Sequence, residues 1–140
     1  MRRVPGPAAL ALVAVLAGAD EWRAPESESV RANPLAATEE ALAKGRALYQ
    51  RHCASCHGDK GRGDGEAARF NSVPTPDLTT PAARRASDGE ILWKITTGRR
   101  QGVEVIMPSV RNSVKAEEDR WKVVLYVRAL TAPVSASPAP

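Results

Sequence analysis

The chain contains two cysteines, and both lie in one short motif, Cys53-Ala54-Ser55-Cys56-His57. A disulfide between residues this close in the sequence closes a very short loop, so it would stabilise a fold little. Large apolar side chains are also scarce, with 1 Phe, 2 Tyr and 3 Trp among 140 residues. A small domain buries only part of its surface. This chain therefore needs a bound group to fill the centre of its fold.

Three kinds of site use cysteines at this spacing. A thioredoxin-like redox pair requires a strand–helix–strand context, whereas the flanks of this motif are typical of helices. A structural zinc site uses four ligands at wider spacing, and here His52 and His57 are crowded against Cys53 and Cys56. The pattern C-x-x-C-H is that of covalent haem attachment, in which the adjoining histidine binds the iron. We therefore predict one haem c, bonded to Cys53 and Cys56 and ligated by His57.

The sixth position of the iron is left for another residue, and the best candidate is Met107. A methionine is often a flexible core residue that fills a gap, but this one is expected in a loop, directly before Pro108. Proline restricts its own backbone and that of the preceding residue, so a stiff segment would hold the thioether on the iron. The rival is His52, which precedes the anchored Cys53 and should point away from the distal face. We predict that Met107 is the second axial ligand.

The composition divides the chain into four segments. Residues 1–19 combine a basic start, a short apolar run and the exit Ala17-Gly18-Ala19, which are the features of a secretory signal peptide. An uncleaved membrane anchor is the alternative, although the apolar run is shorter than the roughly 20 residues that a bilayer core requires. We expect residues 20–37 to be a flexible acidic linker and residues 132–140 a disordered Ala/Pro/Ser tail. The folded domain is then 38–131.

Cleavage near Ala19 would deliver the domain to the periplasm, peripheral to membrane complexes at most. From Ala41 to Thr131 the chain carries 16 basic and 10 acidic residues. A positive excess can steer a protein to an acidic partner, whereas an exported protein is not expected to meet nucleic acid. The basic residues expected near the haem edge are Lys60, Arg62, Arg84, Arg85, Arg99 and Arg100. They form either a docking rim for acidic electron donors and acceptors or scattered solvated charge.

Capping residues and apolar periodicity predict three main helices. Thr38 can cap a helix that runs toward Arg51 and delivers the cysteine motif. The run Ser87-Asp88-Gly89-Glu90 is a capping box, and Gly98 should end the helix that it opens. A last helix begins near residues 115–117 and has an apolar stripe of helical period. This stripe consists of Val123, Tyr126, Val127 and Leu130.

The stretch between these helices, residues 57–86, is rich in glycine and proline. A loop this long is unusual in a compact domain, unless it wraps a bound group. We identify no strand pattern. The sequence therefore predicts an all-α fold of three to four helices and long loops wrapped around one covalent haem.

The domain resembles the bacterial class I c-type cytochromes. The run from Gly45 through Tyr49 to Cys53-Ala54-Ser55-Cys56-His57-Gly58 is similar to their first helix and haem anchor. Met107-Pro108-Ser109 resembles their axial-ligand loop, and Trp121 through Leu130 resembles their last helix, whose aromatic residue packs against the glycine of the first. The resemblance implies His/Met ligation, haem attachment after export, and electron transfer in which no bond is made or broken.

Three functions follow from these expectations. The first is a single-electron carrier that shuttles between periplasmic or membrane-bound redox proteins. The second is a permanent monohaem subunit of a respiratory complex. Asn33-Pro34, Gly63-Asp64-Gly65, Met107-Pro108-Ser109 and Arg120-Trp121 are similar to the cytochrome subunit of alternative complex III quinol oxidoreductases. The third is a haem enzyme or gas sensor, which would require an open iron. The first two involve no catalytic residue of the chain's own.

Overall fold

The structure is a computed structural model that describes residues 22–133. The expected signal peptide, 1–19, and most of the expected tail, 134–140, lie outside the described residues. The elements are α1 (Glu26–Ser29), α2 (Glu39–His52), α3 (Ala54–His57), a 3₁₀ helix η1 (Glu66–Phe70), α4 (Pro81–Arg84), α5 (Asp88–Thr97), β1 (Arg99–Gln101), β2 (Glu104–Met107) and α6 (Glu117–Thr131). The predicted helical fold is confirmed for this part of the chain.

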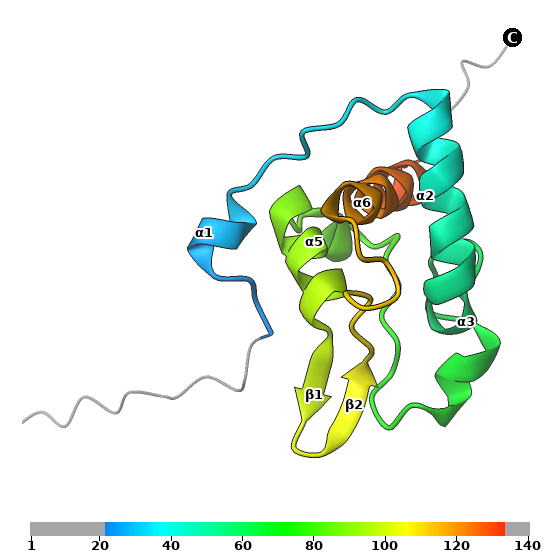
Figure 1. Cartoon of the computed structure of the whole chain (residues 1–140). Helices are drawn as coiled ribbons and strands as arrows, with labels where there is room; N and C mark the ends of the chain where they lie inside the picture. Colours follow the sequence, from blue (N-terminus) through cyan, green and yellow to red (C-terminus); the bar gives the residue numbers. More distant parts are fainter. Residues whose placement is uncertain (1–21, 134–140) are drawn as a thin grey trace, which may run out of the picture.

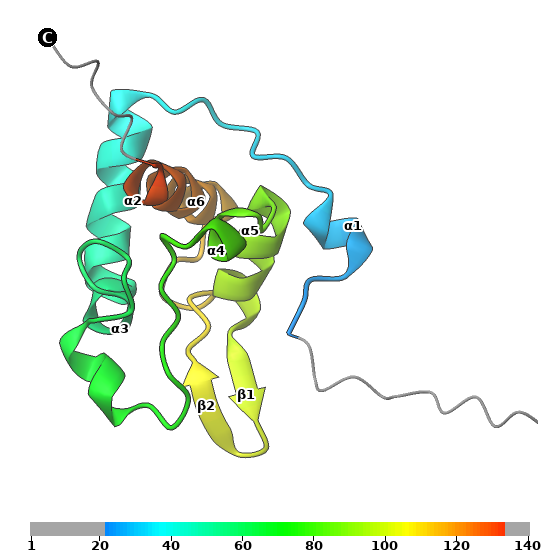
Figure 2. The same ribbon diagram turned by 180° about the vertical axis from the view of Figure 1, so that it is seen from behind.

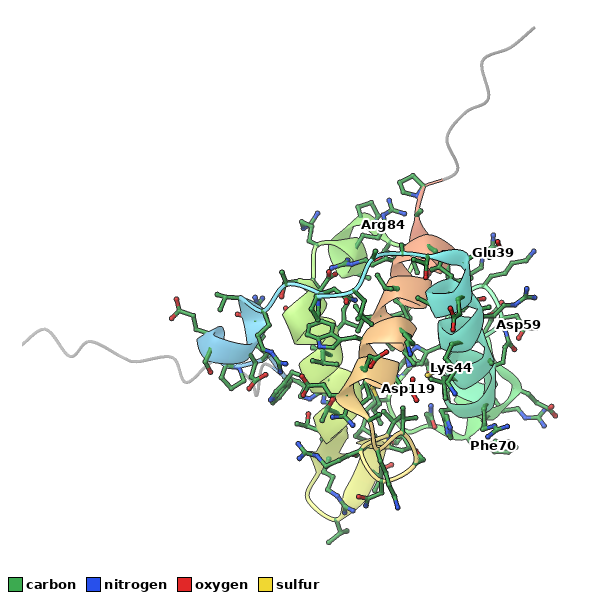
Figure 3. All side chains as sticks on the ribbon, turned by 45° about the horizontal axis from the view of Figure 1, so that its top comes forward. Glu39, Lys44, Asp59, Phe70, Arg84 and Asp119 are labelled. Carbon is green, nitrogen blue, oxygen red and sulfur yellow. The ribbon has the colours of Figure 1, made fainter. Side chains whose placement is uncertain are left out.

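The most extensive contact between helices is the crossing of α2 and α6. Thr38 caps α2, because its side chain accepts a hydrogen bond from the Ala41 amide, as the sequence predicts. At Gly45 the two backbones meet so closely that a Cβ would lie 2.1 Å from the carbonyl oxygen of Lys122. Lys44 of α2 faces Asp119 of α6 at the edge of this crossing (Figure 3). A glycine is therefore required where the helices cross.

The buried core lies between α6 and α5. α2 and α5 lie on either side of α6, which is seen nearly along its axis in Figure 1. Ser87 caps α5 by accepting a hydrogen bond from the Glu90 amide, as the capping box predicts. Gly98, with φ of +68°, ends the helix, as also predicted. The buried cluster consists of Leu92, Ile95, Val110, Val114, Trp121, Val123 and Val124. Figure 2 shows the short helix α4. Arg128 of α6 donates a hydrogen bond to the Arg84 carbonyl oxygen at the end of α4.

The segment before α2 is in contact with the domain, which corrects the expectation of a flexible linker for residues 22–37. α1 packs against α5 (Figures 1 and 2). Ser87 donates a hydrogen bond to the Ser29 carbonyl oxygen at 2.5 Å, and Asn33 donates to the Trp121 carbonyl oxygen at 3.0 Å. The sequence does not reveal this packing because many of the contacts are made by polar side chains and backbone, and the segment has no apolar period.

A small antiparallel hairpin corrects the expectation that the domain has no strand. β1 and β2 pair with Arg99 opposite Met107, and the ladder is irregular between Arg99 and Arg100. Gly102, with φ of +58°, lies in the turn. The strands hold three and four residues, which is too few for an alternating pattern to be recognised in the sequence.

Two further short helices lie in the stretch that the sequence predicts to be loop. These are η1 and α4, which hold five and four residues. Proline at the start of α4 and the Thr80 side chain, which accepts from the Ala83 amide, explain why a helix begins there. Within residues 22–133, no helix has the length and apolarity needed to cross a bilayer.

The α2–α6 crossing leads to a prediction about stability. Gly45→Ala would force the two helices apart, because the new methyl group meets backbone that cannot yield. We expect the free energy of unfolding to fall by about 2 kcal/mol, measured by chemical denaturation of the haem-loaded protein. Ala43→Ser, at an exposed position on the same helix, should change it by about 0.5 kcal/mol at most. Equal effects of the two substitutions would contradict the requirement for glycine.

Candidate functional site

The cysteine motif lies at the turn where α2 ends and α3 begins. The Cys53 amide donates to the Tyr49 carbonyl oxygen, and the His57 amide donates to the Cys53 carbonyl oxygen at 2.9 Å. Both cysteines are half-buried, as is His57. Two thiols and an imidazole are thereby held on one short turn.

Burial controls the electrostatics of this turn. It raises the pKa of the Cys53 thiol to about 12, with a smaller contribution from the charge of Cys56. Burial also lowers the pKa of His57, so the ring is neutral at neutral pH. Neutral imidazole is the form that binds metals. The Nδ1 atom of His57 is buried and has no hydrogen-bond partner among the described residues.

Tyr49 of α2 is hydrogen-bonded to the residue that directly follows His57. Its hydroxyl donates a buried hydrogen bond of 2.7 Å to the Gly58 carbonyl oxygen. Its side chain is 1% exposed, and its ring lies 5.3 Å from that of Tyr126. The spacing of Gly45 and Tyr49 places both on one face of α2, but nothing in the sequence identifies the carbonyl group that Tyr49 binds.

Glycines let the next loop fold back onto the motif. The Gly63 amide donates to the His57 carbonyl oxygen at 2.9 Å, and the Gly65 amide donates to the Cys56 carbonyl oxygen at 3.0 Å. A Cβ on Gly65 would lie 2.3 Å from the Ser55 carbonyl oxygen. The carbonyl groups at the end of α3 are thus paired with backbone rather than water. No side chain could occupy this contact.

Met107 lies at the end of β2, not in an irregular loop as expected. The residues after it are joined to α5. The Ser109 side chain donates to the Thr96 carbonyl oxygen at 2.6 Å, and the Val110 amide donates to the Ile95 carbonyl oxygen at 2.9 Å. The strand before Met107 and these bonds after it fix the segment at both ends.

The structure brings the cysteine turn and Met107 to the same core. Cys53 and Met107 are far apart in the sequence, yet both are half-buried and pack against the same buried cluster. His52, the rival ligand, is the last residue of α2 and is half-buried.

These residues fit the predicted haem better than the alternatives. Between residues 22 and 133, no group of three or more His, Cys, Asp and Glu side chains is placed to hold a metal ion. The same part of the chain has a two-stranded antiparallel sheet and lacks the strand–helix–strand context of thioredoxin-like pairs. A half-buried imidazole and a thioether can ligate haem iron, and two thiols on one turn can bond to the porphyrin.

Four of the six basic residues of the expected docking rim are exposed. They are Lys60, Arg62, Arg85 and Arg100. Arg84 is instead engaged with the carbonyl oxygens of Thr79 and Thr131. Arg99 is half-buried, and its guanidinium lies 5.7 Å from the centre of the Trp22 ring.

Exposed apolar side chains accompany these charges, which the sequence does not indicate. Phe70, at the end of η1 and labelled in Figure 3, is 76% exposed, and Val105 of β2 is 46% exposed. The loop after Phe70 and strand β2 face each other across a narrow groove. Ser72 donates a hydrogen bond to Glu104 at 2.5 Å across it.

Comparison with known proteins identifies a family. Residues 40–127 match the family model described as "Cytochrome C oxidase, cbb3-type, subunit III". No curated protein sequence matches the chain significantly. Among solved structures, a chain of the reducing HAO-like protein complex from Kuenenia stuttgartiensis is 29% identical, with a TM-score of 0.60. That match covers 69% of this chain and 46% of the other.

Two further solved structures have lower similarity. Cytochrome cL from Methylophaga aminisulfidivorans is 22% identical, and the match covers 66% of this chain and 57% of the other. The c-type cytochrome XoxG from Methylobacterium extorquens is 23% identical, with coverages of 66% and 51%. Both have a TM-score of 0.49. The chain thus spans about half the length of these proteins.

The hydrogen bond of Tyr49 leads to the second prediction. Tyr49→Phe removes the hydroxyl and leaves the Gly58 carbonyl oxygen buried without this donor. We expect the free energy of unfolding to fall by about 1–2 kcal/mol, measured by chemical denaturation. Tyr126→Phe is the matched control, because no hydrogen bond of the Tyr126 hydroxyl occurs within residues 22–133. A control as destabilised as Tyr49→Phe would show that ring contacts, not the hydroxyl, matter.

Proposed function

The chain belongs to the family of cytochrome c oxidase, cbb3-type, subunit III, and we propose that it is a single-electron carrier with His57 and Met107 as its axial ligands. As a member of that family it is a c-type cytochrome that carries haem c and transfers electrons. In this proposal Cys53 and Cys56 hold the haem covalently. The observation that carries the ligand assignment is the packing of Cys53 and Met107 against one buried cluster.

The residues of the turn have separate roles in this proposal. When bound, the haem supplies an iron that alternates between the ferric and ferrous states. The thiols of Cys53 and Cys56 form thioethers with it and fix its position on the turn. His57 ligates the iron as a neutral imidazole, a form that its burial favours. Its backbone carbonyl oxygen accepts from the Gly63 amide, which fixes the backbone from which the ring extends.

Met107 would supply the second ligand of the iron through its thioether sulfur. A thioether is a weak ligand that water or a stronger base can replace, so its segment has to be fixed. The hydrogen bonds of Ser109 and Val110 to α5 support this role. Methionine and histidine together favour a higher reduction potential than two nitrogen ligands. No step of electron transfer then requires a substrate pocket or a proton-transferring side chain.

We further propose that the protein is exported and acts in the periplasm, with acidic redox partners. The features of residues 1–19 support export. The exposed basic residues Lys60, Arg62, Arg85 and Arg100 would attract an acidic partner. The association of such a pair weakens as salt rises, because salt screens exposed charges.

A permanent subunit of a respiratory complex, of the alternative complex III type, is the second candidate. Two observations favour it. The similar chain from Kuenenia stuttgartiensis belongs to a multi-protein complex. In addition, Asn33, which lies within the similarity to alternative complex III, hydrogen-bonds to the carbonyl oxygen of Trp121, so the segment before α2 is part of the structured protein.

The ligand assignment predicts a spectroscopic result. The ferric protein should show the weak far-red absorption band of iron bound to a thioether. Met107→Ala should abolish this band and let the ferrous protein bind carbon monoxide, because the sixth position is vacated. The matched control is His52→Ala, which should keep the band and exclude carbon monoxide. A wild-type protein that lacks the band and binds carbon monoxide readily would overturn the carrier assignment and favour an enzyme or sensor.

The two candidate functions predict different behaviour in the native cell. A shuttle should be released with the periplasmic fraction and be washed from membranes by about 0.5 M salt, where the screening length is only a few ångströms. A permanent subunit should stay with membranes at that salt concentration and copurify in detergent with fixed partners. Haem-stained gels of the washed fractions distinguish these outcomes.

A further inference from the structure

The N-terminal segment reaches the end of α5 through Trp22. The indole Nε1 donates a hydrogen bond of 3.2 Å to the Gly98 carbonyl oxygen. The ring lies 6.4 Å from that of Trp93, at an angle of 48°. Two cations also lie near it, with Lys94 Nζ at 5.1 Å and the Arg99 guanidinium carbon at 5.7 Å from its centre. Cation–ring contacts of this kind are attractive, so several separate contacts hold Trp22 beside Gly98.

Gly98 is also the residue against which the proposed ligand segment rests. A Cβ at this position would lie 2.5 Å from the Met107 carbonyl oxygen, 2.6 Å from the Ser109 amide nitrogen and 3.0 Å from the carbonyl carbon of Pro108. The φ of Gly98 is +68°, which favours glycine. The backbone that follows Met107 therefore touches the Gly98 backbone directly, with no side chain between them.

The segment that carries Trp22 is anchored independently of this contact. The carbonyl oxygen of Glu28 lies so close to α5 that a Cβ on Gly89 would come within 2.0 Å of it. Arg31 forms ion pairs with Glu28 and Glu117, and its guanidinium lies 5.3 Å from the centre of the Trp121 ring. Trp22 thus extends from a segment that is already attached to α5 and α6.

We propose that Trp22 is a positioning residue for Met107. Its hydrogen bond holds the Gly98 carbonyl in place, and the Gly98 backbone in turn packs against the backbone of Met107 and Pro108. This support keeps the thioether close to the iron and disfavours its replacement by another ligand. The inference rests on the proposed function, because it requires that Met107 is an axial ligand.

The test measures how easily an added base displaces the thioether. Full-length, haem-loaded ferric protein is titrated with imidazole, and the far-red band reports the fraction of iron bound by Met107. Trp22→Phe keeps an aromatic ring but removes the N–H donor. The Thr97 hydroxyl, which donates to the Trp93 carbonyl oxygen at 2.8 Å, lies 3.3 Å from the Gly98 carbonyl oxygen and can turn its proton there, so this variant is expected to fold. Trp22→Leu removes both the donor and the ring.

We expect imidazole to bind about fivefold more tightly to Trp22→Phe than to wild type, as loss of one hydrogen bond would allow. Trp22→Leu should bind it more tightly still. Arg31→Gln is the matched control, because it weakens the same segment at contacts that do not include Gly98. It should lower the unfolding temperature and leave the dissociation constant for imidazole unchanged. A purely structural Trp22 would likewise change only the unfolding temperature.

Three results would overturn the inference, and they differ in what else they remove. If wild type shows the far-red band and both Trp22 variants bind imidazole with the same affinity as wild type, only the role of Trp22 is overturned. A control variant that binds imidazole as tightly as Trp22→Phe would assign the effect to the whole segment instead of the contact with Gly98. A wild-type protein without the far-red band would overturn the proposed function and this inference together.

Discussion

The close approach of α2 and α6 at Gly45 is the contact on which the rest of the structure depends. It fixes the end of α2, from which the cysteine turn follows without a linker. It also fixes α6, whose Trp121, Val123 and Val124 fill the core against α5. A bulkier residue at Gly45 would push α2, and with it the cysteine turn, away from α6. Because the contact is between backbones, no rearrangement of side chains can replace it.

The cysteine turn is held mainly by the backbone, and this suits a protein that transfers electrons without forming bonds. Amides of two loop glycines bind the carbonyl groups of Cys56 and His57, and Tyr49 binds the next carbonyl along the chain. Groups fixed in this way change little when the charge on a bound iron changes. Burial lowers the pKa of His57, which favours the neutral imidazole that the proposed ligation requires.

Local chemistry explains what the sequence could predict. Thr38, Ser87 and Gly98 mark helix ends correctly because capping depends on one residue and its immediate neighbours. The cysteine motif predicts its site because the haem itself dictates the spacing. The hairpin at Met107 escapes prediction because its strands are too short to show a period. The contacts of Trp22 with Gly98 and of Asn33 with Trp121 join residues far apart in sequence, and no local pattern encodes them.

The turn between β1 and β2 is highly exposed. Val103 is 97% exposed, and a Cβ on Gly102 would meet no atom within 4 Å. Insertions are tolerated where the backbone is exposed and unpaired, so family members can vary in length here without altering the haem-bearing core. Extra residues at this turn would lie close in the sequence to Met107. Such an insertion could form a recognition loop near the proposed ligand while leaving the interior unchanged.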